Sequence, residues 1–178
     1  GLRDDEEDPR GPEIVALGDS FTLGWGVEQG ETFVARLEKL TGRKILNAGM
    51  SSFGTEREAR LFQRLDRSRV KTVILQYSGN DGAENETASK PGGLDIRDRS
   101  EYERISRKHV RKTKYFPFKL TYYLLMDTIR RKRDSRAPMP VEDEIRNFLS
   151  VFERIRGLAP DARFLIMELN GRGQARSD

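Results

Sequence analysis

The stretch that decides the fold is Ile14-Val15-Ala16-Leu17-Gly18-Asp19-Ser20-Phe21-Thr22-Leu23-Gly24-Trp25-Gly26-Val27. Its apolar first part ends abruptly at Gly18, and an acid, a hydroxyl and a loop with two further glycines follow. A buried strand that leads into a tight, polar, glycine-containing turn is how an α/β protein presents a reactive side chain at the edge of its sheet. This pattern makes Ser20 the first candidate for a functional residue.

Strands and helices are predicted to alternate along the chain. Apolar and β-branched runs predict strands at residues 13–18, 44–47, 70–77 and 162–169. Apolar residues at helical spacing predict helices at residues 32–40, 55–65 and 141–157, and two basic helices, with a break near Pro117, within residues 98–135. Residues 82–97 are rich in Gly, Glu, Asn and Pro and are predicted to be a loop. The alternation indicates an α/β fold, in which helices cover both faces of a parallel sheet.

Each of the first three predicted strands ends in a small, polar turn that contains glycine. The turns are Gly18-Asp19-Ser20, Asn47-Ala48-Gly49 and Gly79-Asn80-Asp81. Right-handed crossovers bring the carboxyl ends of parallel strands to one edge, so the three turns should lie where such sheets bind ligands. One such turn alone is explained more simply as a chain reversal or a helix cap, whereas three in succession favour a site.

A serine hydroxyl becomes a nucleophile when a base removes its proton and donors stabilise the oxyanion formed by its attack on a carbonyl. Gly49 offers a backbone N–H that no Cβ shields, and Asn80 offers a side-chain amide. Together with the N–H of Ser20, these groups are candidates for an oxyanion hole with three donors. Gly18 and Gly79 are interpreted as supporting residues of the two turns.

The acids beside these turns have simpler interpretations as well as chemical ones. Asp19 either tunes the nucleophile turn or closes it through its side chain. Asp81 is interpreted as a cap for the helix or turn that follows Asn80. Thr55 and Glu58 have the spacing of a capping box, which predicts that Thr55 caps the second helix.

These residues resemble the sequence blocks of the SGNH, or GDSL, hydrolases over residues 13–81. The matching blocks are Gly18-Asp19-Ser20-Phe21-Thr22, Asn47-Ala48-Gly49 and Gly79-Asn80-Asp81. The resemblance implies a flavodoxin-like, three-layer α/β/α fold with Ser20 as nucleophile, and Ser20, Gly49 and Asn80 as oxyanion-hole donors. It implies ester hydrolysis or, less often, acyl transfer, without a metal or organic cofactor. Gly1-Leu2-Arg3-Asp4 is also similar to the segment that precedes the first block in membrane-tethered bacterial members.

The chain departs from the family pattern in its fourth block, Asp-x-x-His, which supplies the general base and its orienting acid. This block does not occur in the 178 residues. The one histidine, His109, lies in a run of basic residues with no acid to orient it, and is interpreted as a solvated side chain. We expect a piece of a longer protein whose last strand and helix are missing, or else a degenerate member. The chain alone is therefore expected to be weakly active or inactive.

Length and composition suit one domain, or most of one. Residues 1–12 are predicted to be a polar lead-in to a hydrolase-like domain at 13–178, with a basic helical insert at about 97–136. The insert holds fourteen Lys/Arg and five Asp/Glu, a net charge of +9 in a chain of net charge +4. Because the basic character is local, a nucleic-acid partner is not expected. The absence of cysteine and the single histidine disfavour thiolate chemistry and zinc sites.

The insert also contains the most aromatic segment, residues 115–129, which either lines an acyl pocket or packs as an ordinary amphipathic helix. The basic run Arg130-Arg131-Lys132-Arg133 either meets an anionic membrane surface or an acidic glycan, or is a solvated face. The sequence thus predicts a serine esterase or acylhydrolase acting on a small-molecule, lipid or glycan ester. The alternatives are an O-acetyltransferase of a cell-surface glycan and a non-catalytic, scaffold-like module.

Overall fold

The computed structural model describes residues 11–79, 81–90, 93, 96, 99–113, 118–133 and 140–169. The chain divides into two units, one formed by Gly1–Ile96 with Pro140–Asp178 and the other by Arg97–Met139. We call them the sheet unit and the helical unit.

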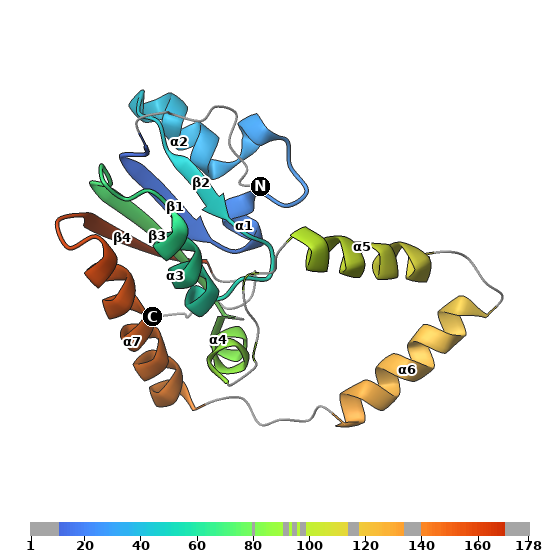
Figure 1. Cartoon of the computed structure of the whole chain (residues 1–178). Helices are drawn as coiled ribbons and strands as arrows, with labels where there is room; N and C mark the ends of the chain where they lie inside the picture. The colour runs from blue at the N-terminus through green and yellow to red at the C-terminus, as the bar shows by residue number, and fades with distance from the viewer. Residues whose placement is uncertain are drawn as a thin grey trace, which may run out of the picture. The chain divides into compact units, whose positions relative to one another are not determined.

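The sheet unit is built on four parallel strands among the described residues, in the order β2-β1-β3-β4 (Figure 1). The strands are β1 (Ile14–Gly18), β2 (Leu46–Gly49), β3 (Thr72–Ser78) and β4 (Arg163–Leu169). Every pair is parallel, and Gly18 of β1 lies opposite Gly49 of β2. The predicted α/β fold with a parallel sheet is confirmed. All five residues of β1 are buried, as expected for an inner strand covered on both faces.

Helices cover the two faces of the sheet (Figure 1), and a separate apolar core lies on each face. Ile14 and Ala16 face the core that includes Val34, which lies on α2 (Phe33–Thr41). Val15 and Leu17 face the larger core, which includes residues of α3 (Thr55–Arg64) and α7 (Val141–Leu158). Successive side chains of a strand point to opposite faces, so one apolar run supplies both cores.

One helix of the sheet unit was not predicted, because residues 82–97 were expected to form a loop. Instead, α4 (Asp81–Ser89) is helical. Its Gly, Asn and Thr residues are weak helix formers, and the sequence therefore indicates no helix. Asn85 and Ala88 are buried. The carboxamide oxygen of Asn85 also accepts a hydrogen bond from the Glu56 N–H of α3 at 2.8 Å. Packing against α3 thus overrides the weak propensity.

Two local predictions are wrong for a similar reason. Thr55 does not cap α3, because Gly54 occupies the N-cap position and the Thr55 hydroxyl instead donates to Asp81 at 3.4 Å. Residues 47–49 are not a turn after β2 but the strand itself, paired with residues 16–18 of β1. In both cases the structure depends on residues distant in the sequence, namely Asp81 for Thr55 and β1 for residues 47–49. A local sequence pattern does not identify such partners.

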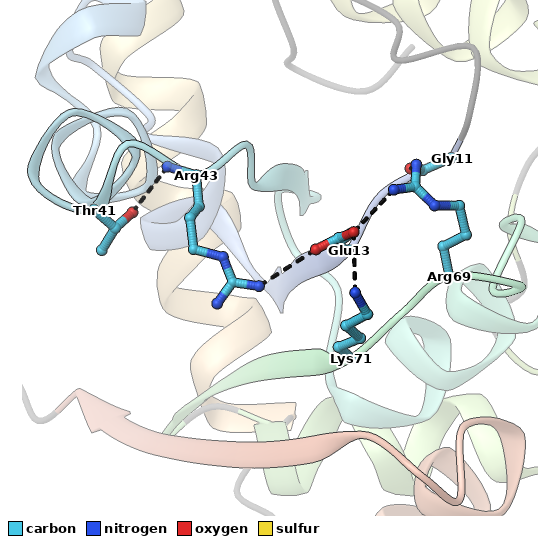
Figure 2. A network of polar contacts seen from close by, with 6 residues as sticks. All are labelled: Gly11, Glu13, Thr41, Arg43, Arg69 and Lys71. Carbon is cyan, nitrogen blue, oxygen red and sulfur yellow. Dashed lines mark hydrogen bonds and ion pairs between the residues drawn. The ribbon is translucent and has the colours of Figure 1, made fainter.

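At the amino-terminal ends of the strands, an ion-pair network around Glu13 connects the segments that precede β1, β2 and β3 (Figure 2). The carboxylate lies 2.8 Å from the Arg69 guanidinium, 3.1 Å from the Lys71 ammonium and 3.4 Å from the Arg43 guanidinium. The hydrogen bond and charge of Lys71, followed by the charge of Arg69, lower the pKa of Glu13. Glu13 precedes β1 and Ser20 follows it, so this network lies at the opposite end of the strand from the candidate nucleophile.

The helical unit contains α5 (Arg99–Thr113) and α6 (Lys119–Arg133). Two basic helices were predicted within residues 98–135 with a break near Pro117, and Pro117 itself lies outside the described residues. The described side chains of α6 are exposed.

Candidate active site

Ser20 lies at the point where β1 gives way to α1 (Ser20–Leu23). The preceding Asp19 is the N-cap, and its carboxylate accepts a hydrogen bond from the Phe21 N–H at 2.8 Å. Gly24 ends the helix in the left-handed region, at φ 76°, which only glycine adopts without strain. As a result, Ser20 is a half-buried first residue of a single helical turn at the carboxyl end of an inner strand.

Asp19 is buried and holds the turn against β3 as well. Its second carboxylate oxygen accepts a hydrogen bond from the Ser78 hydroxyl at 3.1 Å. The Ser78 N–H in turn donates to the Asp81 carboxylate at 3.2 Å. These contacts connect the turn after β1 with the turn after β3, in agreement with the interpretation of Asp19 as a residue that closes its turn.

Gln76 is a site residue that the sequence reasoning missed. It is fully buried on β3, and its carboxamide oxygen accepts from the Asp19 N–H at 3.2 Å and from the Thr22 hydroxyl at 3.0 Å. One side chain therefore fixes both ends of the segment that carries Ser20. The available signal was a single carboxamide inside the otherwise apolar run of residues 73–75 and Tyr77, where a buried polar group requires partners.

Gly18 and Gly49 allow α1 to lie directly on the sheet. A Cβ at Gly18 would come within 2.1 Å of the Thr22 hydroxyl oxygen and 2.6 Å of the Gln76 carboxamide oxygen. A Cβ at Gly49 would come within 2.2 Å of the Leu23 backbone nitrogen. Both distances are far below any van der Waals contact, so each position excludes a side chain unless α1 moves.

Asn47 belongs to the second of the predicted turns, although the sequence assigned it no role, and its side chain forms hydrogen bonds with both α1 and the end of β2. Its amide nitrogen donates to the Thr22 carbonyl at 2.9 Å. Its amide oxygen accepts from the Gly49 N–H at 3.0 Å. The N–H expected to stabilise an oxyanion is thus hydrogen-bonded to Asn47 in this structure.

Of the predicted site residues, the structure brings Gly18, Asp19, Ser20 and Gly49 together. Gly79 follows β3 and is exposed. Asn80, the third expected donor, lies outside the described residues, and so does the side chain of His109. The relation of these two side chains to Ser20 remains a prediction from the sequence.

Two further acids are buried beneath this edge of the sheet. Asp81 is fully buried, and burial followed by the charge of Asp19 raises its pKa to about 7 against the bond donated by Ser78. Glu58 is fully buried, and neither of its carboxylate oxygens has a hydrogen-bond partner among the described residues. Burial, and then the charges of Asp81 and Asp19, raise the pKa of Glu58 well above its usual value. This cluster therefore favours protonated carboxyl groups.

Chemically, the arrangement presents a serine hydroxyl at a rigid strand–helix junction, with a small-residue strand end beside it. As the first residue of α1, Ser20 has an N–H without an intrahelical acceptor. Such a site suits nucleophilic attack on a carbonyl group.

Comparison with known proteins gives one family. The model of the GDSL-like lipase/acylhydrolase family matches residues 16–178, which confirms the resemblance drawn from the sequence. A search of curated protein sequences finds no significant match.

Several solved structures are similar. They include a G-D-S-L family protein from Desulfitobacterium hafniense DCB-2, at 15% identity over 90% of this chain and 61% of that one, with a TM-score of 0.49. Phospholipase A1 from Streptomyces albidoflavus NA297 has 17% identity over 93% and 65%, with a TM-score of 0.46. AlinE4, an SGNH-hydrolase family esterase, has 23% identity over 85% and 73%, with a TM-score of 0.38. The chain thus spans less than two thirds of the length of the first two. By the match to its family model, the chain belongs to the GDSL-like lipase/acylhydrolase family.

Proposed function

We propose that this chain is the nucleophile-bearing part of a serine-dependent ester hydrolase that works through an acyl-Ser20 intermediate. The observation that carries the proposal is the position of Ser20. It begins α1 at the carboxyl end of an inner parallel strand, in a turn held by Asp19 and Gln76, and Gly49 of β2 lies opposite Gly18, two residues before it. Family membership supports hydrolase chemistry, and the geometry supports Ser20 as the residue that performs it.

In the proposed reaction, the Ser20 hydroxyl oxygen attacks the acyl carbon while its proton passes to a general base. The ester C–O bond then breaks, and the alcohol leaves with that proton. Water attacks the acyl-serine in the second half, which releases the acid and restores the hydroxyl. A metal ion or organic cofactor is not part of the proposed reaction.

The proposed oxyanion donors are the N–H groups of Ser20 and Gly49 and the side chain of Asn80. The Gly49 N–H donates to Asn47 in the present structure, so a substrate carbonyl has to share or replace that bond. Removing one oxyanion donor from a serine hydrolase typically lowers turnover by about 10²–10³. A substrate-induced shift of the Asn47 side chain is therefore part of the proposal.

The general base is the remaining requirement. The sequence has no Asp-x-x-His block, and no imidazole is described beside Ser20 within the residues that the structure covers. We propose that the base is a histidine of the complete protein outside these 178 residues. Loss of the base from a serine triad costs on the order of 10⁴–10⁶ in turnover, so the isolated chain should hydrolyse esters far more slowly than the complete protein.

The test is hydrolysis of p-nitrophenyl esters of increasing acyl length by the complete protein and its Ser20→Ala variant. Ser150→Ala, an exposed serine on α7, is the matched control. Loss of turnover in Ser20→Ala with retention in Ser150→Ala supports the proposal. Equal activity in all three proteins contradicts it.

A competition experiment separates hydrolysis from acyl transfer. If an added glycan acceptor captures the acyl group in preference to water, the protein is a transferase that uses the same nucleophile. If the complete protein neither hydrolyses the esters nor transfers the acyl group, the alternative of a non-catalytic, scaffold-like module is favoured over an enzyme.

A further inference from the structure

The helical unit carries a set of exposed apolar side chains on α6 and directly before it. Leu120 is 74% exposed, and Leu124 and Leu125 are each 60% exposed, and they lie on the same helix, α6. Tyr122, Tyr123 and Met126 are also exposed, as is Phe118 directly before the helix. A contiguous apolar surface of this kind marks an interaction site, whereas single exposed apolar residues do not.

These side chains point around the helix rather than to one side. Successive residues of an α-helix are about 100° apart, so five neighbours, residues 122–126, surround its axis. A flat protein surface covers one side of a helix and leaves the other side in water. An interfacial helix lies about 5–10 Å deep in the boundary between headgroups and acyl chains, and a helix with its side chains is about 10–12 Å across, so lipid covers more of the circumference than a flat surface does.

Charge separates this unit from the rest of the chain. Residues 97–139 hold fourteen Lys/Arg and five Asp/Glu, a net charge of +9, which leaves −5 for the remaining residues because the whole chain carries +4. Within α6, Lys119 precedes the apolar segment and the basic run of residues 130–133 follows it. Basic residues beside an inserted apolar segment bind anionic lipid headgroups.

The apolar segment is too short to cross a bilayer. The helix has 15 residues, against roughly 20 apolar residues for a membrane span. Over the described part of the chain, no helix is both long and apolar enough to span a membrane. If α6 lies in the plane of the membrane surface, its short length is no obstacle, its apolar side chains contact lipid, and the basic residues at its ends can bind headgroups.

We propose that the helical unit docks on an anionic lipid surface, with Phe118 and the apolar residues of α6 in the boundary between headgroups and acyl chains. An acidic glycan would meet the charges but leave the apolar side chains in water. A second copy of this chain would bring one unit of +9 against another. The inference is independent of the chemistry at Ser20, and its test therefore uses no activity.

The test is flotation of the protein with phosphatidylcholine vesicles, with and without phosphatidylglycerol. Binding should occur with phosphatidylglycerol, weaken as salt is raised, and fall about tenfold or more in Leu124→Glu. The matched control is Leu40→Glu, which makes the same charge change at an 83% exposed leucine of α2 and should bind like the wild type. Circular dichroism verifies that both variants are folded.

A second pair of variants isolates the charge. Replacing the four basic residues 130–133 by Gln should weaken vesicle binding about as strongly. The same number of replacements at exposed basic residues of the sheet unit, Arg36, Lys39, Lys44 and Arg64, should have little effect.

Three outcomes overturn the proposal. The first is the absence of vesicle binding at low salt. The second is equal binding by Leu124→Glu and Leu40→Glu together with tight binding to heparin, which points to a glycan. The third is a concentration-dependent dimer that Leu124→Glu dissociates in sedimentation velocity, which points to a second copy.

Discussion

Asp81 makes folding stability depend on pH in a direction unusual for a carboxylate. Its pKa rises from the usual 3.8 to about 7, chiefly through burial, and the charges of Asp19 and Glu84 act in the same direction. The folded state therefore keeps a proton that the unfolded chain releases above pH 4. The free energy of unfolding should fall as pH rises through this window and level off above pH 7.

The magnitude follows from the same values. Each pKa unit corresponds to about 1.4 kcal/mol, and the folded-state carboxyl is already half deprotonated at pH 7, so Asp81 should cost about 2 kcal/mol of stability between pH 5 and pH 7. Asp81→Asn removes the titration, while its amide oxygen can still accept from the Ser78 N–H and the Thr55 hydroxyl. The gain in stability from the substitution should thus grow by about 2 kcal/mol between pH 5 and pH 7.

Urea unfolding of the wild type and Asp81→Asn at pH 5, 6, 7 and 8 measures this difference. Glu58 titrates in the same cluster, where the charge of Asp81 raises its pKa and that of Arg57 lowers it. Glu58→Gln should consequently flatten the pH dependence too, and the double variant should be the flattest. Wild-type and Asp81→Asn stability curves that run parallel across this range would refute the reasoning.

Two further predictions concern the contacts that hold Ser20. Gly49→Ala should displace α1, because the added Cβ would come within 2.2 Å of the Leu23 nitrogen. Thermal unfolding should show a loss of about 1–3 kcal/mol, whereas the control Gly30→Ala, in open space, should be neutral. Gln76→Leu leaves the Asp19 N–H and the Thr22 hydroxyl without their buried acceptor, which should cost about 1–3 kcal/mol for each group. In urea unfolding, a Gln76→Leu variant as stable as the wild type would contradict the assigned role.

Much of the fold was predictable because its determinants are local. The apolar run of residues 14–17 supplies both cores, and the break at Gly18 marks the strand end that Ser20 follows. The nearness of Ser20 and Gly49 follows from parallel pairing alone, since Gly18 and Gly49 lie opposite each other.

The features that the sequence did not predict depend on contacts between segments distant in the sequence. Gln76 is one polar residue in a buried run, and no periodicity shows that its oxygen accepts from the Ser20 turn. Glu58 has the spacing of a capping residue, yet Gly54 is the N-cap of α3, and the Glu58 carboxyl is buried without a hydrogen-bond partner among the described residues. Helix α4 is formed from weak helix formers that pack on α3.

The central claim is that Ser20 is the nucleophile, and covalent labelling tests it most directly. The complete protein is treated with a fluorophosphonate probe, digested and mapped by mass spectrometry. The account predicts one adduct on Ser20, retained in Ser150→Ala and lost in Ser20→Ala. An unlabelled wild type, or an adduct on another residue that persists in Ser20→Ala, would contradict it.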